Sequence, residues 1–424
     1  MHRTKRFRMV AAICGVSLFA LSACATQDTT NSEESPAGEE TSTTAAEDDG
    51  SSEAPCDVNG NAQGISDSTI KLGAFTPLTG PVADPGNGTL TGQQIVFDKV
   101  NAEGGIDGRQ IELIVVDDKY DPAEAQKSVR KLNEQDEVFA ISGGVGTPNF
   151  VATLPYIKSE AIPAIGPYAP SNQVGVMDNP NVYMIWPNYV DEFEVTTKYL
   201  LETVKPKKIA MIQMQGDVGD DALAGVEKAL EGSDYTLDDI VAVEATTTDY
   251  SPMVQQLKDT GADWVISINQ PTGTGQVIQA AKKIGYEPRW LTWSGMTDAS
   301  WIAAFPDDAD GIVAATLTAS FDDPDPLVQQ FVSDIKAETG ADPTVWNAVG
   351  YAQGLVTVEA LRNAPSLTRE CLEYSLQQIQ GFETGIIPPV SFGPDSRQGT
   401  SAVGIAEIVD GRVTELAPFL PVTR

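Results

Sequence analysis

The chain is poor in histidine, in cysteine and in positive charge. Its only histidine is His2, and its 27 Lys and Arg stand against 60 Asp and Glu, a formal net charge of −33. We expect His2 to be removed with an N-terminal signal described below, which leaves no histidine for a His-based catalytic triad or for the commonest general base. The acid excess argues against nucleic-acid binding, which needs clustered Lys and Arg. We therefore expect no nucleic-acid partner, no metal and no other cofactor.

Long hydrophobic runs are also missing, because the apolar stretch near the start covers only the 12 residues 9–20. A membrane-spanning helix needs roughly 20 such residues. Four basic residues precede the stretch with no acidic one: Arg3, Lys5, Arg6 and Arg8. A positive segment followed by a short apolar one is typical of an export signal.

The end of this signal, Leu21-Ser22-Ala23-Cys24, resembles the lipobox of bacterial lipoproteins. The resemblance implies that residues 1–23 are a signal peptide and that Cys24 carries a lipid. The mature protein would then be anchored on the outer face of the cytoplasmic membrane. An ordinary signal peptide with a chance cysteine is the alternative.

The segment after Cys24 is acidic and of low complexity. Residues 25–55 contain nine Asp and Glu and no Lys or Arg, so they cannot bury enough apolar surface to offset chain entropy. We expect residues 24–64 to be a lipidated, disordered tether. The fold would run from about residue 66 to the C-terminus, which is more than one core usually supports, so two domains are expected.

Two cysteines remain once Cys14, in the signal, and Cys24 are set aside. Cys56 and Cys371 make an even pair, and such pairs outside the cytoplasm can form a disulfide. Two unrelated thiols are the alternative. Two cysteines without other ligands do not make a zinc site.

Short apolar runs alternate with amphipathic stretches in two consecutive series. The runs expected to be strands are 70–75, 111–116, 138–142 and 163–165, then 209–212, 240–244, 264–268 and 289–293. The stretches expected to be helices are 93–101, 123–132 and 150–160, then 191–204, 220–231, 251–260 and 275–284. Apolar strands that alternate with helices indicate a parallel sheet covered on both sides. The fold class predicted is therefore α/β, with two doubly wound lobes that bind ligand beyond the carboxyl ends of their strands.

Two loops at these strand ends draw attention, residues 76–82 and 143–148. The second is a Gly-Gly-Val-Gly-Thr-Pro loop that opens a helix, where backbone N–H groups favour a carboxylate or other anion. It is no dinucleotide fingerprint, because Asn149 stands where a third glycine is needed. Tight turns that need unusual backbone angles remain the alternative explanation for such glycines.

The order and spacing of several motifs resemble one family, the substrate-binding proteins of branched-chain amino-acid type ABC transporters. The motifs span residues 70–73 with 78–81, 101–109, 116–118, 201–206, 249–252 and 298–300. The resemblance implies two α/β lobes joined by three crossovers and closing on a small ligand. Lobe 1 would hold residues 66–187 and 319–385, and lobe 2 residues 188–318 and 386–424.

The same resemblance implies a monomer that delivers its ligand to an ABC permease. A ligand-sensing lipoprotein of the same fold is the alternative. An enzyme is disfavoured by the shortage of histidine and by the lack of a Gly-x-Ser-x-Gly nucleophile motif.

The family's ligand-binding positions can be carried onto this sequence. Thr147 takes the place of the hydroxyl that holds the ligand carboxylate, and Pro170 stands where a Thr is usual, although a shift of one residue would place Ser171 there. Val218 and Gln270 replace two aromatic residues. Further candidates for the pocket lie in the loops at strand ends: Thr79, Tyr168, Ala169 and Trp293.

Ser294 replaces the acidic residue that pairs with the ligand ammonium in the family. A buried ammonium without a carboxylate partner costs several kcal/mol. We therefore expect a ligand with no obligatory α-ammonium, such as a carboxylate, an amide or another neutral polar molecule. The alternative is that the acid comes from elsewhere; Asp84, Asp217 and Asp298 are nearby in sequence.

Overall fold

A computed structural model describes residues 55–422 apart from residues 81 and 245. All of them belong to one unit, Glu53–Arg424. The expected signal peptide, Cys24 and most of the tether lie outside the described residues. Among the residues that are described, no helix is both long enough and apolar enough to cross a membrane.

The first sheet has five parallel strands in the order β2-β1-β3-β4-β5. They are β1 (Thr69–Thr76), β2 (Gln110–Asp117), β3 (Ala140–Ser142), β4 (Ala164–Ile165) and β5 (Val182–Tyr183). Central β1 is buried on both faces, with Ile70 and Leu72 fully covered. The run from Leu72 to Phe75 is accordingly apolar without alternation.

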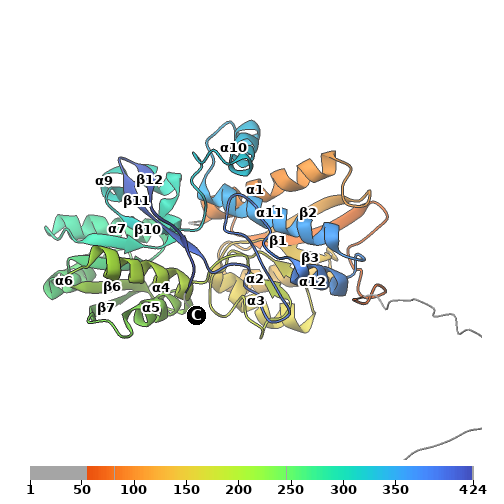
Figure 1. Cartoon of the computed structure of the whole chain (residues 1–424). Coiled ribbons are helices and arrows are strands. Elements are labelled where there is room, and N and C mark those ends of the chain that lie inside the picture. Colours follow the sequence, from red (N-terminus) through yellow and green to blue (C-terminus); the bar gives the residue numbers. More distant parts are fainter. Residues whose placement is uncertain (1–54, 81, 245, 423–424) are drawn as a thin grey trace, which may run out of the picture. The chain divides into compact units, whose positions relative to one another are not determined.

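The second sheet has seven strands in the order β12-β11-β10-β9-β8-β6-β7. They are β6 (Ile209–Met214), β7 (Leu237–Val243), β8 (Trp264–Ile268), β9 (Arg289–Thr292), β10 (Val313–Thr316), β11 (Val403–Val409) and β12 (Arg412–Leu420). Its strands β6, β7, β10, β11 and β12 are labelled in Figure 1. Strands β6 to β10 are parallel, whereas β11 pairs antiparallel with both β10 and β12. The C-terminal hairpin thus extends an otherwise parallel sheet.

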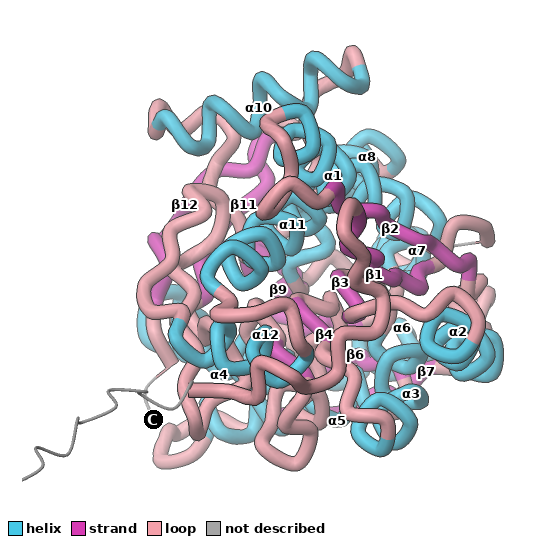
Figure 2. Tube along the Cα trace, turned by 90° about the vertical axis from the view of Figure 1, so that its right-hand side faces the viewer, coloured by secondary structure: helices cyan, strands magenta, loops and turns pink. Residues whose placement is uncertain are grey.

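Helices cover both faces of the first sheet. They are α1 (Ala83–Ala102), α2 (Pro122–Glu134), α3 (Thr147–Ser159), α11 (Val345–Asn363) and α12 (Arg369–Gln378), and α10 (Pro326–Thr339) packs on α1 and α11. Figure 2 shows the strands β1 and β3 between the pair α1 and α11 and the pair α2 and α3. Helices α1 and α11 approach closely at Gly350. A Cβ at this position would lie 1.7 Å from the carbonyl oxygen of Thr89, so the glycine permits the close approach. We call this sheet with its helices the first lobe.

The second sheet carries its own helices, and together they form the second lobe. They are α4 (Tyr189–Tyr199), continued by a π-helix (Leu200–Val204), then α5 (Asp217–Leu230), α6 (Ser251–Thr260), α7 (Pro271–Lys283), a 3-10 turn (Ser294–Thr297), α8 (Ala299–Ala304) and α9 (Pro306–Ala309). Asn188 caps α4, because its side chain accepts a hydrogen bond from the backbone N–H of Asp191.

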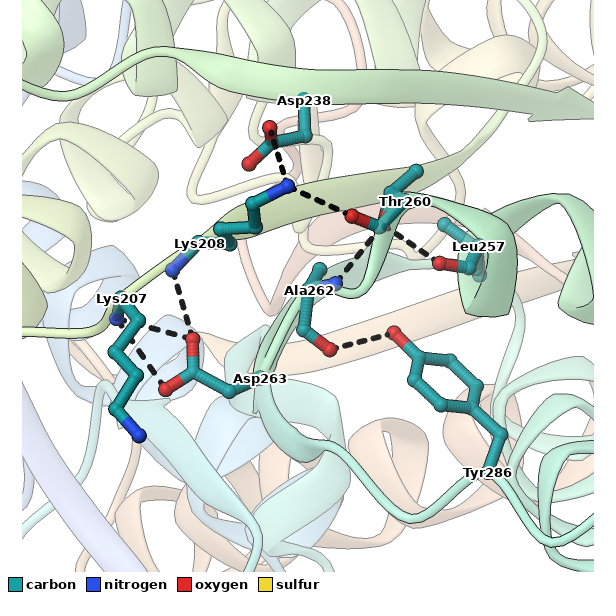
Figure 3. A network of polar contacts seen from close by, with 8 residues as sticks. All are labelled: Lys207, Lys208, Asp238, Leu257, Thr260, Ala262, Asp263 and Tyr286. Carbon is teal, nitrogen blue, oxygen red and sulfur yellow. Dashed lines mark hydrogen bonds and ion pairs between the residues drawn. The ribbon is translucent and has the colours of Figure 1, made fainter.

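A polar network fixes the second sheet at the amino ends of its strands (Figure 3). The Asp263 carboxylate accepts hydrogen bonds from the backbone N–H groups of Lys207 and Lys208, at 3.0 and 2.8 Å. The Lys208 ammonium donates to the carbonyl of Thr260, and the Tyr286 hydroxyl donates to the carbonyl of Ala262. In α/β sheets this is the edge away from the ligand crevice, so the network serves stability.

The chain passes between the lobes three times: between β5 and α4, between β10 and α10, and just before β11. The third crossing comes later than the boundary at residue 386 expected from the sequence. The Met184 N–H donates to the Arg397 carbonyl at 2.8 Å, and the Gly399 N–H donates to the Met184 carbonyl at 2.7 Å. Backbone pairing beyond β5 therefore keeps residues up to Gly399 with the first lobe.

Cys56 and Cys371 form a disulfide, with an S–S distance of 1.96 Å. Cys371 is fully buried on α12. Next to the bond, the Asn61 N–H donates to the Glu370 carboxylate at 3.0 Å, and the Arg369 N–H donates to the Asn61 carbonyl at 2.8 Å. The segment that precedes β1 is thus fastened to the first lobe.

Candidate functional site

A cavity of about 60 Å³ lies where the carboxyl ends of both sheets meet. The first lobe contributes residues that follow β2, β3 and β4, and the second lobe residues that follow β6, β8 and β9. The lining residues are Val82, Pro85, Tyr120, Val145, Gly146, Thr147, Tyr168, Tyr189, Met214, Val218, Ile268, Asn269, Gln270, Pro271, Trp293 and Trp346. One water needs about 10–15 Å³ of such space, so the cavity is narrow.

The wall of this cavity is aromatic and carries no charge. Five lining residues are Tyr or Trp, and none of the described residues that line it is Lys, Arg, Asp or Glu. The polar residues among the lining are Thr147, Asn269, Gln270 and the three tyrosines. A mostly apolar cavity with a few placed polar groups is typical of small-molecule sites.

The N-terminus of α3 forms one end of the cavity. Gly146 precedes the helix with a φ of 126°, and a Cβ there would approach the Tyr120 ring to 3.2 Å, so a glycine is required. Thr147 is the first residue of the helix and is buried. Unpaired N–H groups and the helix dipole make such a terminus favourable for an anion.

Tyr168 links the two lobes. Its carbonyl accepts a hydrogen bond from the Gly146 N–H at 3.1 Å, and its hydroxyl lies 3.4 Å from the Ser294 hydroxyl of the second lobe. Its ring packs edge-on against Trp346 with the centroids 5.4 Å apart. Burial raises the pKa of Tyr168, so the hydroxyl keeps its proton.

Glu192, on α4, is the residue that the sequence analysis missed. Its carboxylate accepts a 2.7 Å hydrogen bond from the Ser294 N–H, and the Ser294 hydroxyl lies 3.4 Å from the other oxygen. The side chain is fully buried, and burial raises its pKa to about 7 although the bonds from Ser294 act in the opposite direction. A buried carboxyl group thus contacts position 294, where the sequence itself has no acid, and neither residue lines the cavity.

A second buried acid supports the opposite wall. Asp118 follows β2, and its carboxylate accepts a 2.9 Å hydrogen bond from the Tyr120 N–H. Burial raises the pKa of Asp118 to about 6 and that of the Tyr120 phenol to about 12. Tyr120 has a φ of 58°, so this bond helps to hold its strained backbone at the cavity.

The residues predicted from the sequence are placed in three ways. Five of them line the cavity: Thr147, Tyr168, Val218, Gln270 and Trp293. Three are buried but do not line it: Ala169, Pro170 and Ser294. Thr79 is exposed, and its hydroxyl donates to the Asp117 carboxylate at 2.7 Å.

None of the three acids considered from the sequence lines the cavity. Asp84 and Asp217 are exposed, and Asp298 caps α8. The other lining residues that the sequence analysis did not name as ligand-binding include Tyr120, Tyr189, Met214, Asn269 and Trp346. Asn269 directly follows the predicted strand 264–268, and Tyr120 lies four residues after the predicted strand 111–116, so the strand-end rule could have found both.

Two carboxylates of the second lobe bind backbone N–H groups of the first. Asp221, on α5, accepts from the Asn172 N–H at 2.9 Å, and Asp298 accepts from the Val345 N–H, at the start of α11, at 3.0 Å. Burial raises the pKa of both acids. These bonds hold the lobes together around the cavity.

Comparison with known proteins agrees with this architecture. Residues 69–412 match the family model described as periplasmic binding protein. The chain is 24% identical over 316 residues to a leucine-, isoleucine-, valine-, threonine-, and alanine-binding protein of Pseudomonas aeruginosa, covering 74% of this chain and 84% of the relative. The Leu/Ile/Val-binding protein of Escherichia coli is also 24% identical, over 68% of this chain and 78% of the relative.

Solved structures show the same fold. A fatty acid ABC transporter substrate-binding protein from Thermomonospora curvata superposes with a TM-score of 0.78 at 24% identity, over 85% of this chain and 95% of the other. This similarity and the family match cover both lobes and the cavity between them. The chain belongs to the periplasmic binding protein family.

Proposed function

We propose that the protein is an extracytoplasmic, lipid-anchored solute-binding protein that delivers a small polar ligand to an ABC permease. The observation that carries the proposal is the uncharged, largely aromatic cavity between two α/β lobes. The named relatives, which bind branched-chain amino acids or belong to a fatty acid transporter, support transport of a small molecule. No enzymatic activity is proposed, because the cavity carries no constellation of nucleophile and base.

The ligand is an amino-acid-like molecule, an amide or a carboxylate. Its carboxylate or carbonyl oxygen binds at Gly146 and Thr147, where the α3 N-terminus offers N–H groups and a hydroxyl. Its apolar part packs among the rings that line the cavity. Closure of the lobes gives affinity and presents one shape to the permease.

Cys24 carries the lipid in this proposal and lies outside the described residues. Mass spectrometry of the mature protein checks the anchor, because lipidation adds a diacylglycerol-sized mass to an N-terminal Cys24. A Cys24→Ser variant should be released from membranes. Release of the unmodified protein would contradict the anchor and leave the binding function unaffected.

A thermal-shift screen of amino acids, amides and short carboxylates tests the binding function. Ligand at about 100 times its dissociation constant adds about 2.7 kcal/mol of stability. Thr147→Val should weaken any hit, whereas Thr79→Val is the matched control because Thr79 is exposed and does not line the cavity. Equal losses in both variants, or no hit in the screen, would refute the proposal.

A further inference from the structure

We propose that Gln353 is a positioning residue: from helix α11 it fixes the two loops of the first lobe that lead to Thr147 and carry Tyr168, without lining the cavity itself. The first loop, residues 143–146, follows β3 and opens α3, and the second, residues 166–170, follows β4. The inference rests on the proposed binding function and adds a fully buried side chain that acts on the site only through the main chain.

The side chain of Gln353 bonds to one carbonyl of each loop. Its amide nitrogen donates to the Gly166 carbonyl at 2.8 Å and to the Gly144 carbonyl at 3.5 Å. The loops also pair directly, because the Tyr168 N–H donates to the same Gly144 carbonyl at 2.8 Å and the Gly146 N–H donates to the Tyr168 carbonyl at 3.1 Å. The amide therefore ties the two loops together beyond the ends of β3 and β4.

The neighbouring groups determine how this amide is oriented. Both loop groups are carbonyl oxygens, which only accept hydrogen bonds, so the NH₂ of Gln353 must point to them and its oxygen away. That oxygen is buried and has no hydrogen-bond partner among the described residues. An unpartnered buried acceptor lowers the stability of a fold. Stability therefore does not account for a glutamine at this position, whereas its two bonds to the loops do.

Helix α11 gives Gln353 a rigid support. Gly350 and Gly354, on either side of it in the helix, pack against α1, and a Cβ on Gly354 would lie 2.9 Å from the nearest side-chain atom of α1. One turn further along, the Thr357 hydroxyl lies 2.8 Å from the hydroxyl of Ser142 at the end of β3. Elements packed this closely cannot shift without clashes, so the position of the amide is fixed relative to the sheet.

The loops are shaped to receive this side chain. Gly143 and Gly166 have positive φ angles of 76° and 67°. A Cβ on Gly143 would lie 2.6 Å from the amide oxygen of Gln353, and a Cβ on Gly166 would lie 3.2 Å from its Cγ. Thr147 and Tyr168 are thereby held in place before a ligand arrives, and a preorganised site loses less binding energy to ordering.

Hydrogen exchange of the ligand-free, full-length protein, followed by mass spectrometry, tests this inference. Peptides that cover residues 143–147 and 166–170 report on local opening of the two loops. A peptide of β1 reports on the stability of the whole lobe, so a rise confined to the loops is distinguished from a general loss of stability. Circular dichroism verifies that each variant is folded.

Three variants are compared with the unsubstituted protein at pH 5. Gln353→Met keeps the length of the side chain and removes its donors, and Gln353→Leu, which also has no donor, takes its place if that variant does not fold. Gln353→Glu is the conservative variant, because its buried carboxyl keeps a proton and can donate once. Thr357→Val is the matched control on the same helix, because the Thr357 hydroxyl bonds to the Ser142 hydroxyl and to the Gln353 carbonyl but to neither loop.

We expect Gln353→Met to raise the exchange of both loop peptides about tenfold and that of β1 less than about twofold. Gln353→Glu should lie between this variant and the unsubstituted protein, and Thr357→Val should leave the loops within about twofold. Unchanged loop exchange in Gln353→Met, an equal rise in β1 or in Thr357→Val, or no rescue by Gln353→Glu would overturn the inference. A ligand screen without a hit refutes the proposed function but leaves these exchange rates unchanged, so the two failures are distinguishable.

Discussion

Replacing Glu192 by Gln is expected to stabilise the ligand-free protein at alkaline pH. The folded-state pKa of about 7 lies above the ordinary value of 4.5, so the folded protein holds this proton more tightly than the unfolded chain does. Well below pH 4.5 the carboxyl is neutral in both the folded and the unfolded state, so it makes the free energy of unfolding neither rise nor fall with pH. Between pH 4.5 and about 7 the unfolded chain loses this proton while the folded protein retains it, so the free energy of unfolding falls, and above about 7 both states are ionised and the loss is complete.

The difference between the two pKa values corresponds to about 3 kcal/mol. Glu192→Gln keeps the shape and an oxygen that accepts from the Ser294 N–H but has no proton to lose. The variant should therefore match the unsubstituted protein at pH 4 and exceed it by up to about 3 kcal/mol at pH 9. If the fold melts as one unit, that gain raises its melting temperature by about 4 °C.

Urea unfolding of both proteins at half-unit steps from pH 4 to pH 9 measures this difference. Other carboxyl groups titrate equally in the two proteins, so the difference isolates Glu192. Glu194→Gln is the control, and it should gain no stability because it removes ion pairs to Lys198 and Lys228. A difference that stays flat with pH, or a Glu192→Gln variant that is less stable at pH 9, would refute the reasoning.

Three further substitutions test the packing and the closure. Replacing Cys56 and Cys371 by serine should lower the free energy of unfolding by about 2–5 kcal/mol, as measured with and without reductant, and an unchanged value would contradict a stabilising disulfide. Gly350→Ala should lower the free energy of unfolding by about 1–3 kcal/mol, because α1 lies too close for a methyl group. Gly393→Ala is the control and should lower it by less than about 0.5 kcal/mol, because a Cβ there would have no atom within 4 Å. Equal losses in the two variants would contradict the close approach of the helices. Asp221→Ala should weaken ligand affinity several-fold and enlarge the ligand-free protein in X-ray scattering, and no change in either would contradict its role in holding the lobes together.

Strands buried on both faces could be predicted from the sequence, because they are apolar throughout. The predicted strand at 264–268 has the bounds of β8, and its five residues are all buried. The C-terminal strand β12 was missed because most of its side chains are exposed and its pattern is weak. Helix α11 was missed for the opposite reason: it is buried almost all round, so it lacks the apolar stripe that marks a surface helix.

The site could be predicted only where it follows strand ends. Thr147 and Trp293 were found by that rule and Gln270 by the family resemblance, and all three line the cavity. Glu192 could not be found, because it is one of several acids in its helix and its partner Ser294 is 102 residues away. Only the packing of α4 against the turn after β9 brings the two together.

The disulfide determines how a mechanical load enters the molecule. Any force applied to the chain upstream of Cys56 passes through the sulfur–sulfur bond into α12, and the residues between Cys56 and β1 carry no tension. Strand β1, which lies between β2 and β3 in its sheet, is therefore protected from being peeled out by its own N-terminal end. The first lobe therefore bears a force from the N-terminal attachment as a unit. That force does not act on the motion of the second lobe relative to the first.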